Sequence, residues 1–226
     1  MVALLVIATI LIFIGIELLR QHAGKRKPVP ASISADEHIL IPKGFFLSKA
    51  HVWVEMIFGG EARIGLDDFL QKIVGGVDGL EAAAPGTELK KGETLLTVHS
   101  GSRTLTIPAP ISGTVTKLNE AVMASPKSLQ TDPYITGWVA VLAPKNIVPE
   151  LLLLSVAQDA GRWMRTEIVR FRDFISTQMQ ASQMQAGVPA AIGATLFDGG
   201  LPHFGVLAQF DENTWRAFQK EFLKAE

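Results

Sequence analysis

The hydrophobic positions divide the chain into stretches of different periodicity. Residues 2–19 are apolar at almost every position, the middle alternates in short runs, and the last third has apolar residues three or four positions apart. Continuous, alternating and helical periodicity predict a membrane-spanning helix, short strands and amphipathic helices. We therefore expect an α+β chain in four parts: a transmembrane anchor over 1–20, a basic, proline-containing linker over 21–47, a β-domain over 48–145 and an extension over 146–226.

The run at residues 2–19 is long enough to cross a bilayer, which takes roughly 17–25 apolar residues. Its single charge, Glu17, stands near the end, where it can reach the interface or pair with Arg20. No basic residue precedes the run, whereas four follow it: Arg20, Lys25, Arg26 and Lys27. The positive-inside rule then predicts a single-pass protein of the inner (cytoplasmic) membrane, with its N-terminus outside and its soluble part in the cytoplasm. A buried core helix is the alternative.

The alternating runs of the β-domain end at glycine and proline turns, as strands do. The expected strands are 51–58, 62–66, 77–83, 94–98, 105–107, 114–118 and 138–142. Asp67 can cap a short helix over residues 67–73.

The extension is expected to contain a helix, a β-hairpin and a second helix. Pro149 stands at a favoured first helical position, and the apolar stripe that follows predicts one long helix. Residues 192–197 and 204–210 are the expected hairpin strands, and Asp211 can cap the last helix. The apolar face of that helix carries Trp215, Phe218 and Phe222.

Composition adds mainly exclusions. A formal net charge of −1 does not suggest nucleic-acid binding. The absence of cysteine excludes disulfides, thiolate catalysis and cysteine–zinc sites. The usual phosphate-loop, zinc-protease and nucleophile-elbow motifs are missing. We therefore predict no catalytic residue, metal or cofactor, and a structural role for His51.

Ordered sequence words within residues 48–145 carry a family resemblance. They are His51–Val54, Ile64–Gln71, Pro85–Gly92, Glu93–Gly113, Leu118–Ala121, Ser125–Pro126 and Thr131–Trp138. This order resembles the H-protein of the glycine cleavage system. The resemblance implies a β-sandwich of the lipoyl (barrel-sandwich) type and a protein that is not an enzyme.

The resemblance also points to one hairpin tip. In H-proteins this tip reads Glu-Ser-x-Lys-Ala, and the lysine carries lipoic acid. With Ser112-Gly113 fixing the register, the matching positions are His99, Ser100, Gly101, Ser102 and Arg103. A serine hydroxyl cannot form the lipoyl amide, and a guanidinium stays protonated. Ser102 therefore marks a degenerate acceptor position, and we predict no lipoyl group.

Together these features favour a non-enzymatic, membrane-anchored H-protein-like subunit of a membrane-bound, respiratory or redox complex. Residues 99–103 would dock protein subunits of that complex, although a solvated turn is equally consistent with the sequence. One alternative is a carrier of glycine-cleavage or lipoyl chemistry with an altered acceptor, Ser100 or Ser102. Another is a periplasmic adaptor with a lipoyl-like domain, which the flanking charges oppose.

Overall fold

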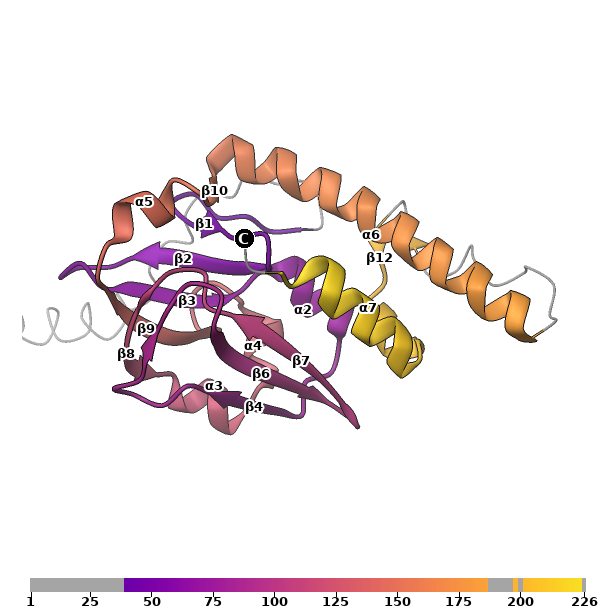
Figure 1. Ribbon diagram of the computed structural model, residues 1–226, viewed down its shortest axis with the longest axis horizontal. Helices are drawn as coiled ribbons and strands as arrows, with labels where there is room; N and C mark the ends of the chain where they lie inside the picture. The colour runs from indigo at the N-terminus through magenta and orange to yellow at the C-terminus, as the bar shows by residue number, and fades with distance from the viewer. Residues whose placement is uncertain (1–38, 187–196, 199–200, 225–226) are drawn as a thin grey trace, which may run out of the picture. The chain divides into compact units, whose positions relative to one another are not determined.

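The computed structural model describes residues 39–186, 197–198 and 201–224, and all of these belong to one compact unit (Figure 1). The expected anchor over 1–20 and most of the linker over 21–47 lie outside the described residues. Within the described ranges, no helix is both long enough and apolar enough to cross a bilayer.

The expected sandwich is confirmed. Within the described residues, a seven-stranded antiparallel sheet has the order β10-β1-β2-β3-β9-β8-β5, and a three-stranded sheet has the order β4-β6-β7 (Figure 1). The strands of the larger sheet are β1 Phe46–Leu47, β2 Val52–Met56, β3 Ala62–Leu66, β5 Glu88–Leu89, β8 Gly113–Leu118, β9 Trp138–Pro144 and β10 Ser155–Val156. Those of the smaller sheet are β4 Gly79–Ala82, β6 Thr94–Ser100 and β7 Arg103–Pro108. Each of the seven expected strands is present; β3 has the expected bounds, and the other six are shifted at one or both ends.

A tryptophan on β2 explains why position 65, in the family-like stretch 64–71, is a glycine. Trp53 is fully buried and donates from Nε1 to the Pro133 carbonyl at 3.2 Å. Gly65, on the neighbouring strand β3, lies directly under this ring, because a Cβ there would be 2.5 Å from Trp53 Cζ2. Any larger residue at position 65 would displace the indole from the core.

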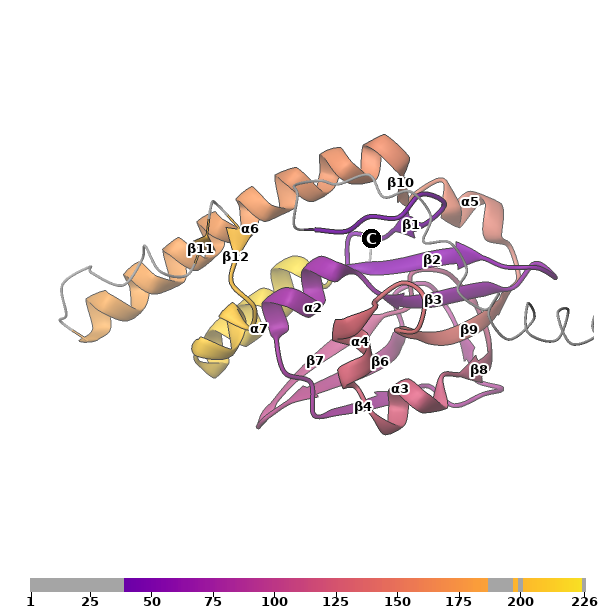
Figure 2. The ribbon, with the colours of Figure 1, turned by 180° about the vertical axis from the view of Figure 1, so that it is seen from behind.

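The chain leaves β3 into the expected short helix. Helix α2 spans Asp68–Val74, and the carboxylate of Asp67 caps it by accepting from the Leu70 N–H at 2.8 Å. The carboxylate of Asp68 accepts from the Leu40 N–H at 2.8 Å, which fixes the segment that precedes β1 against α2. Two further short helices, α3 Glu120–Ala124 and α4 Lys127–Thr131, lie beside α2 and β4 on the side shown in Figure 2.

The expected single helix from Pro149 is wrong. The segment forms a short helix, α5 Ile147–Leu151, then strand β10, then the long helix α6 Ala157–Ala186. The break occurs because β10 pairs with β1, with Val156 opposite Phe46. Ala157 then adopts a left-handed φ of 52°, which turns the chain into α6.

The expected strand over 204–210 is also wrong. The paired strands are β11 Phe197–Asp198 and β12 Leu201–Pro202, and residues Val206–Gln209 form the 3₁₀ helix η2. Residues 192–196 lie outside the described ranges. Gly205 starts η2 with a φ of 70°, and its N–H donates to the Lys72 carbonyl at 2.7 Å. This contact with the end of α2 turns the chain away from an extended path.

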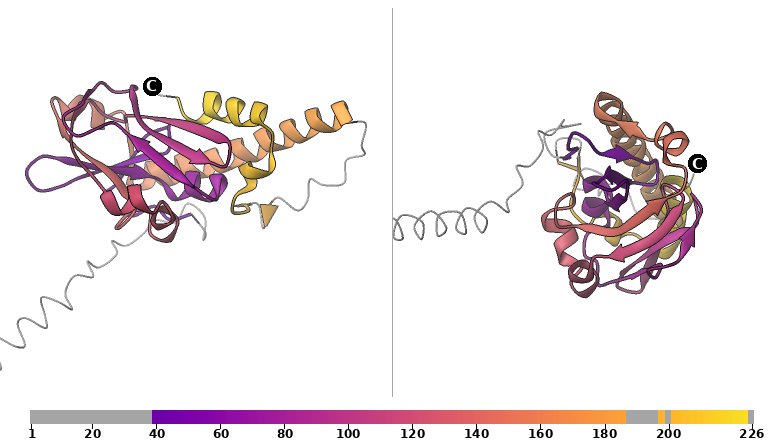
Figure 3. Two further views of the ribbon diagram at one scale, coloured as in Figure 1. Left: turned by 90° about the horizontal axis from the view of Figure 1, so that it is seen from below. Right: turned by 90° about the vertical axis from the view of Figure 1, so that its left-hand side faces the viewer.

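The last helix confirms the expectation and joins the extension to the β-domain. Helix α7 spans Glu212–Phe222, is capped by Asp211, and buries the three predicted aromatic residues. It lies along β7 (Figure 3), where the side-chain amide of Gln219 bonds both backbone groups of Thr106: Oε1 accepts from N–H at 2.7 Å and Nε2 donates to C=O at 2.6 Å. Buried residues of α6, η2 and α7 belong to the same hydrophobic core as the sandwich.

Candidate functional site

The β6–β7 hairpin places the predicted acceptor position at its tip. The strands pair as far as Ser100 opposite Arg103, so Gly101 and Ser102 form the turn. Gly101 has a φ of 59°, a left-handed conformation that glycine adopts without steric cost. Both turn residues are exposed. Ser102 therefore presents its hydroxyl to solvent at the end of the hairpin.

The residues beside the turn bond to the segment that leads into β4. Ser100 donates from its hydroxyl to the Gly76 carbonyl at 2.7 Å, and the Gly101 N–H donates to Asp78 Oδ2 at 2.5 Å. His99 is half-buried, with Nε2 at 3.2 Å from Glu81 Oε1. These contacts hold the tip from one side. Of the five residues from 99 to 103, Gly101 and Ser102 are therefore the exposed ones.

Arg103 reaches from the hairpin to the C-terminal extension. Its guanidinium donates to the Ala208 carbonyl at 2.9 Å and lies 5.4 Å from the centre of the Trp215 ring. The Trp215 indole is held in turn by donation from Nε1 to the Leu207 carbonyl at 2.8 Å. The guanidinium of this predicted docking residue therefore binds the chain's own C-terminal extension.

Replacing Arg103 with glutamate should lower the free energy of unfolding by about 1 kcal/mol, because a carboxylate cannot donate to Ala208 or interact favourably with the Trp215 ring. Urea denaturation measures the change. Ser102→Glu is the matched control, since it adds a negative charge to the exposed turn and removes neither contact; its effect should stay within about 0.5 kcal/mol. Equal effects of the two variants would mean that the Arg103 contacts contribute nothing.

A cluster of charged side chains surrounds His51, the first residue of the family-like stretch 51–54. His51 is fully buried and has a left-handed φ of 60°. Its Nδ1 is 2.8 Å from Asp67 Oδ2, and its Nε2 is 3.4 Å from Glu167 Oε1 on α6. Arg170 continues the chain of charges at 2.5 Å from Glu167. The imidazole also packs against the rings of Phe69 and Trp163, with centroids 4.7 and 5.2 Å away.

Electrostatics favour the charged forms of His51 and Glu167 near neutral pH. Burial alone would lower the pKa of His51, but the carboxylates of Asp67 and Glu167 outweigh it and raise the pKa to about 9. Burial opposes ionisation of Glu167 as well, yet His51 and Arg170 hold its pKa below the usual value. The cluster is an internal ion-pair network that ties α6 to the sandwich, which supports the structural role predicted for His51. The sequence does not single out Glu167, because the apolar stripe that predicts its helix gives no sign of which polar residue faces His51.

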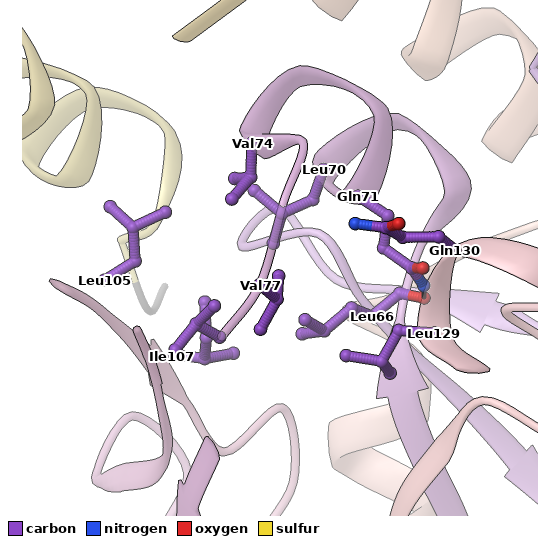
Figure 4. Close-up of a pocket in the computed structure, with 10 residues that line it drawn as sticks. Leu66, Leu70, Gln71, Val74, Val77, Leu105, Ile107, Leu129 and Gln130 are labelled. Carbon is purple, nitrogen blue, oxygen red and sulfur yellow. Dashed lines mark hydrogen bonds between the residues drawn. The ribbon is translucent and has the colours of Figure 1, made fainter. Parts of the chain in front are cut away.

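A small apolar pocket separates α2 from the hairpin (Figure 4). Its walls are mainly aliphatic, and Gln71 and Gln130 supply the polar groups at one end. Gln130 donates from Nε2 to the Gly75 carbonyl at 2.5 Å. The volume of about 10 Å³ is close to that of a single water molecule. This pocket therefore has no room for a cofactor in the conformation seen. Among the described residues, no group of three or more potential ligands could hold a metal ion.

Comparison with known proteins identifies a family that shares this chain's sequence pattern. The family model for the glycine cleavage H-protein matches residues 46–167, which extends past the β-domain into α6. The probable glycine cleavage system H protein of Thermococcus kodakarensis is 33% identical over 126 residues, covering 56% of this chain and 93% of that protein. The glycine cleavage system H protein of Geobacillus thermodenitrificans is 34% identical over 120 residues, covering 53% of this chain and 94% of its own length.

Among solved structures, a glycine cleavage system H protein from Mycobacterium marinum aligns with a TM-score of 0.44 and 25% identity, over 46% of this chain and 87% of its own. The family-model match covers the sandwich, the hairpin and the first turns of α6. On the family model and the sequence relatives, this chain belongs to the glycine cleavage H-protein family.

Proposed function

We propose that this chain is a non-catalytic H-protein-type subunit of a glycine-cleavage or related lipoyl-dependent system, and that it carries no lipoyl group itself. The H-protein family consists of lipoyl carriers and not of enzymes. The relatives are named glycine cleavage system H proteins, which favours carrier-type chemistry over the respiratory scaffold that the sequence first suggested.

The exposed turn is the observation that carries the proposal. The β6–β7 hairpin ends in Gly101 and Ser102, and they occupy the turn where the family pattern would place an acceptor lysine. A lipoyl amide requires a primary amine, which neither residue provides. The polar tip would then serve as a small docking surface, with Gly101 and Ser102 allowing close approach of a partner's backbone.

The second candidate is a carrier whose group is attached in a changed form. It needs a nucleophile at the tip, and Ser102 is the exposed one, whereas the Ser100 hydroxyl is already bonded to Gly76. The family membership favours this candidate, and the weak nucleophilicity of an unassisted serine opposes it.

Intact mass of the chain purified from a lipoylation-competent host separates the two. We expect the mass of the unmodified polypeptide, and a Ser102→Lys variant made in the same host tests whether the tip can still be presented to a lipoyl ligase. A lipoyl increment on the wild-type chain would overturn the proposal, and any other increment that Ser102→Ala removes would establish the altered carrier.

We also propose that residues 2–19 anchor the protein in the cytoplasmic membrane, with the H-protein-type domain in the cytoplasm. The support is the length of the apolar run and the basic residues that follow it. Protease digestion of the domain in intact spheroplasts would contradict this orientation.

A further inference from the structure

An apolar ridge stands on the surface at helix α5. Val148, Leu152 and Leu153 are exposed by 65%, 81% and 63%. Val148 lies on α5, and the two leucines directly follow its last residue, Leu151. The single charged residue of α5, Glu150, faces the domain, where its carboxylate accepts from the N–H and the hydroxyl of Ser112 at 2.7 and 2.6 Å. The outward face is therefore uncharged, which is typical of an interaction surface.

A basic hollow borders the ridge. Leu153 and Leu154 line it together with three lysines from separate parts of the chain: Lys49, Lys91 and Lys224. None of the described residues that line it is acidic. Lysine stems can lie along apolar surface while their ammonium groups reach phosphates, so a ridge and hollow of this kind suit the boundary between lipid tails and anionic headgroups.

We propose that the ridge of Val148, Leu152 and Leu153, with the adjoining lysine hollow, lies against an anionic lipid bilayer. The proposal rests on the membrane anchor proposed above. Residues 20–38 connect the apolar run to the described domain, and even fully extended they reach at most about 70 Å. The domain is thereby confined near the membrane, which raises the effective concentration of the surface it presents there.

A second copy of the chain fits this surface less well. Two-fold symmetry would place the same patch against itself and bring the lysines of both hollows together. Anionic headgroups complement those charges instead. The turn between β2 and β3 lies at the same end of the domain as α5 in Figures 1 and 2, and its Phe58 is fully exposed, at 103%. It offers a second apolar contact at this end.

The absence of cysteine allows a direct test. The full chain with Leu152→Cys is labelled with the fluorophore NBD and reconstituted into phosphatidylglycerol-containing vesicles, with and without brominated acyl chains. We expect blue-shifted emission that bromine quenches. The matched control is Phe204→Cys, a residue exposed by 60% between β12 and η2, away from α5, whose label should remain unquenched.

Charge reversal tests the lysine hollow. Lys91→Glu with Lys224→Glu should reduce quenching at position 152 to the level of the Phe204 site, whereas Lys117→Glu with Lys127→Glu, two exposed lysines elsewhere on the domain, should not. If charge reversal in the hollow leaves quenching unchanged, the lysines do not contact lipid and the proposal fails.

The possible failures are distinguishable. A chain that floats with the vesicles but keeps an unquenched label at position 152 overturns the surface and leaves the anchor standing. A chain that does not float overturns both. A blue shift without bromine quenching, together with cross-linked dimers, would assign the ridge to a second copy and overturn the lipid assignment.

Discussion

Replacing His51 with asparagine is expected to lower the free energy of unfolding by about 3 kcal/mol or more, because Asp67 and Glu167 would remain buried without their shared cation. Asparagine tolerates the left-handed φ of 60° better than most residues, so the effect reports on charge more than on backbone strain. Chemical denaturation at pH 7 measures the loss.

The pH profile of stability gives a second readout. The folded-state pKa of His51 is about 9 against an ordinary value of 6.5, so its contribution is fully present below pH 6.5 and is lost as the pH rises through 9. Such a shift corresponds to about 3 kcal/mol. The wild-type protein should therefore lose stability across this window, and the His51→Asn variant should not.

His99→Asn is the control for His51→Asn. The His99 side chain is 32% exposed and faces a largely exposed carboxylate, so its loss should cost less than about 1 kcal/mol. A wild-type protein whose stability stays constant between pH 6.5 and 9 would show that His51 does not carry the buried charge described.

The second large effect is expected at Phe171. Replacing it with alanine should cost about 3–5 kcal/mol, because this fully buried ring on α6 connects three helices. Its centroid lies 5.5 Å from that of Phe69 on α2, and 6.0 and 5.8 Å from those of Phe218 and Phe222 on α7. Hydrogen exchange should show α7 losing protection before the β6–β7 hairpin does.

Phe204→Ala serves as the control for the aromatic cluster. Phe204 is exposed by 60%, so truncation should change stability by no more than about 0.5 kcal/mol. Uniform loss of protection in the Phe171 variant, with α7 and the hairpin opening together, would mean that the extension and the sandwich unfold as one cooperative unit and that α7 is not selectively released.

The features predicted correctly from sequence are those set by local rules. Alternation and turn residues located the sandwich strands, and the side chains of Asp67 and Asp211 cap their helices as expected. Capping involves residues only three positions apart, so a capping residue can be recognised from the sequence without knowing the tertiary structure.

The failures occurred where distant segments meet. The apolar period after Pro149 continues through Ser155, yet pairing of β10 with β1 breaks the helix there. The bond from Gly205 to Lys72 and that from Arg103 to Ala208 likewise join segments far apart in sequence. The tip was identified from the family pattern, whereas the partners that fix Arg103 and His51 depend on how the extension folds back.

The amide of Gln219 has a consequence for assembly. Strand β7 is an edge of the three-stranded sheet, and exposed edges accept further strands from other chains, in peptide recognition and in aggregation alike. Gln219 offers Thr106 one acceptor and one donor, as a neighbouring strand would, and α7 carries it across that edge. A partner that recognises this hairpin must therefore engage its turn from the end, because the side of β7 at Thr106 is already occupied by the chain's own C-terminal helix.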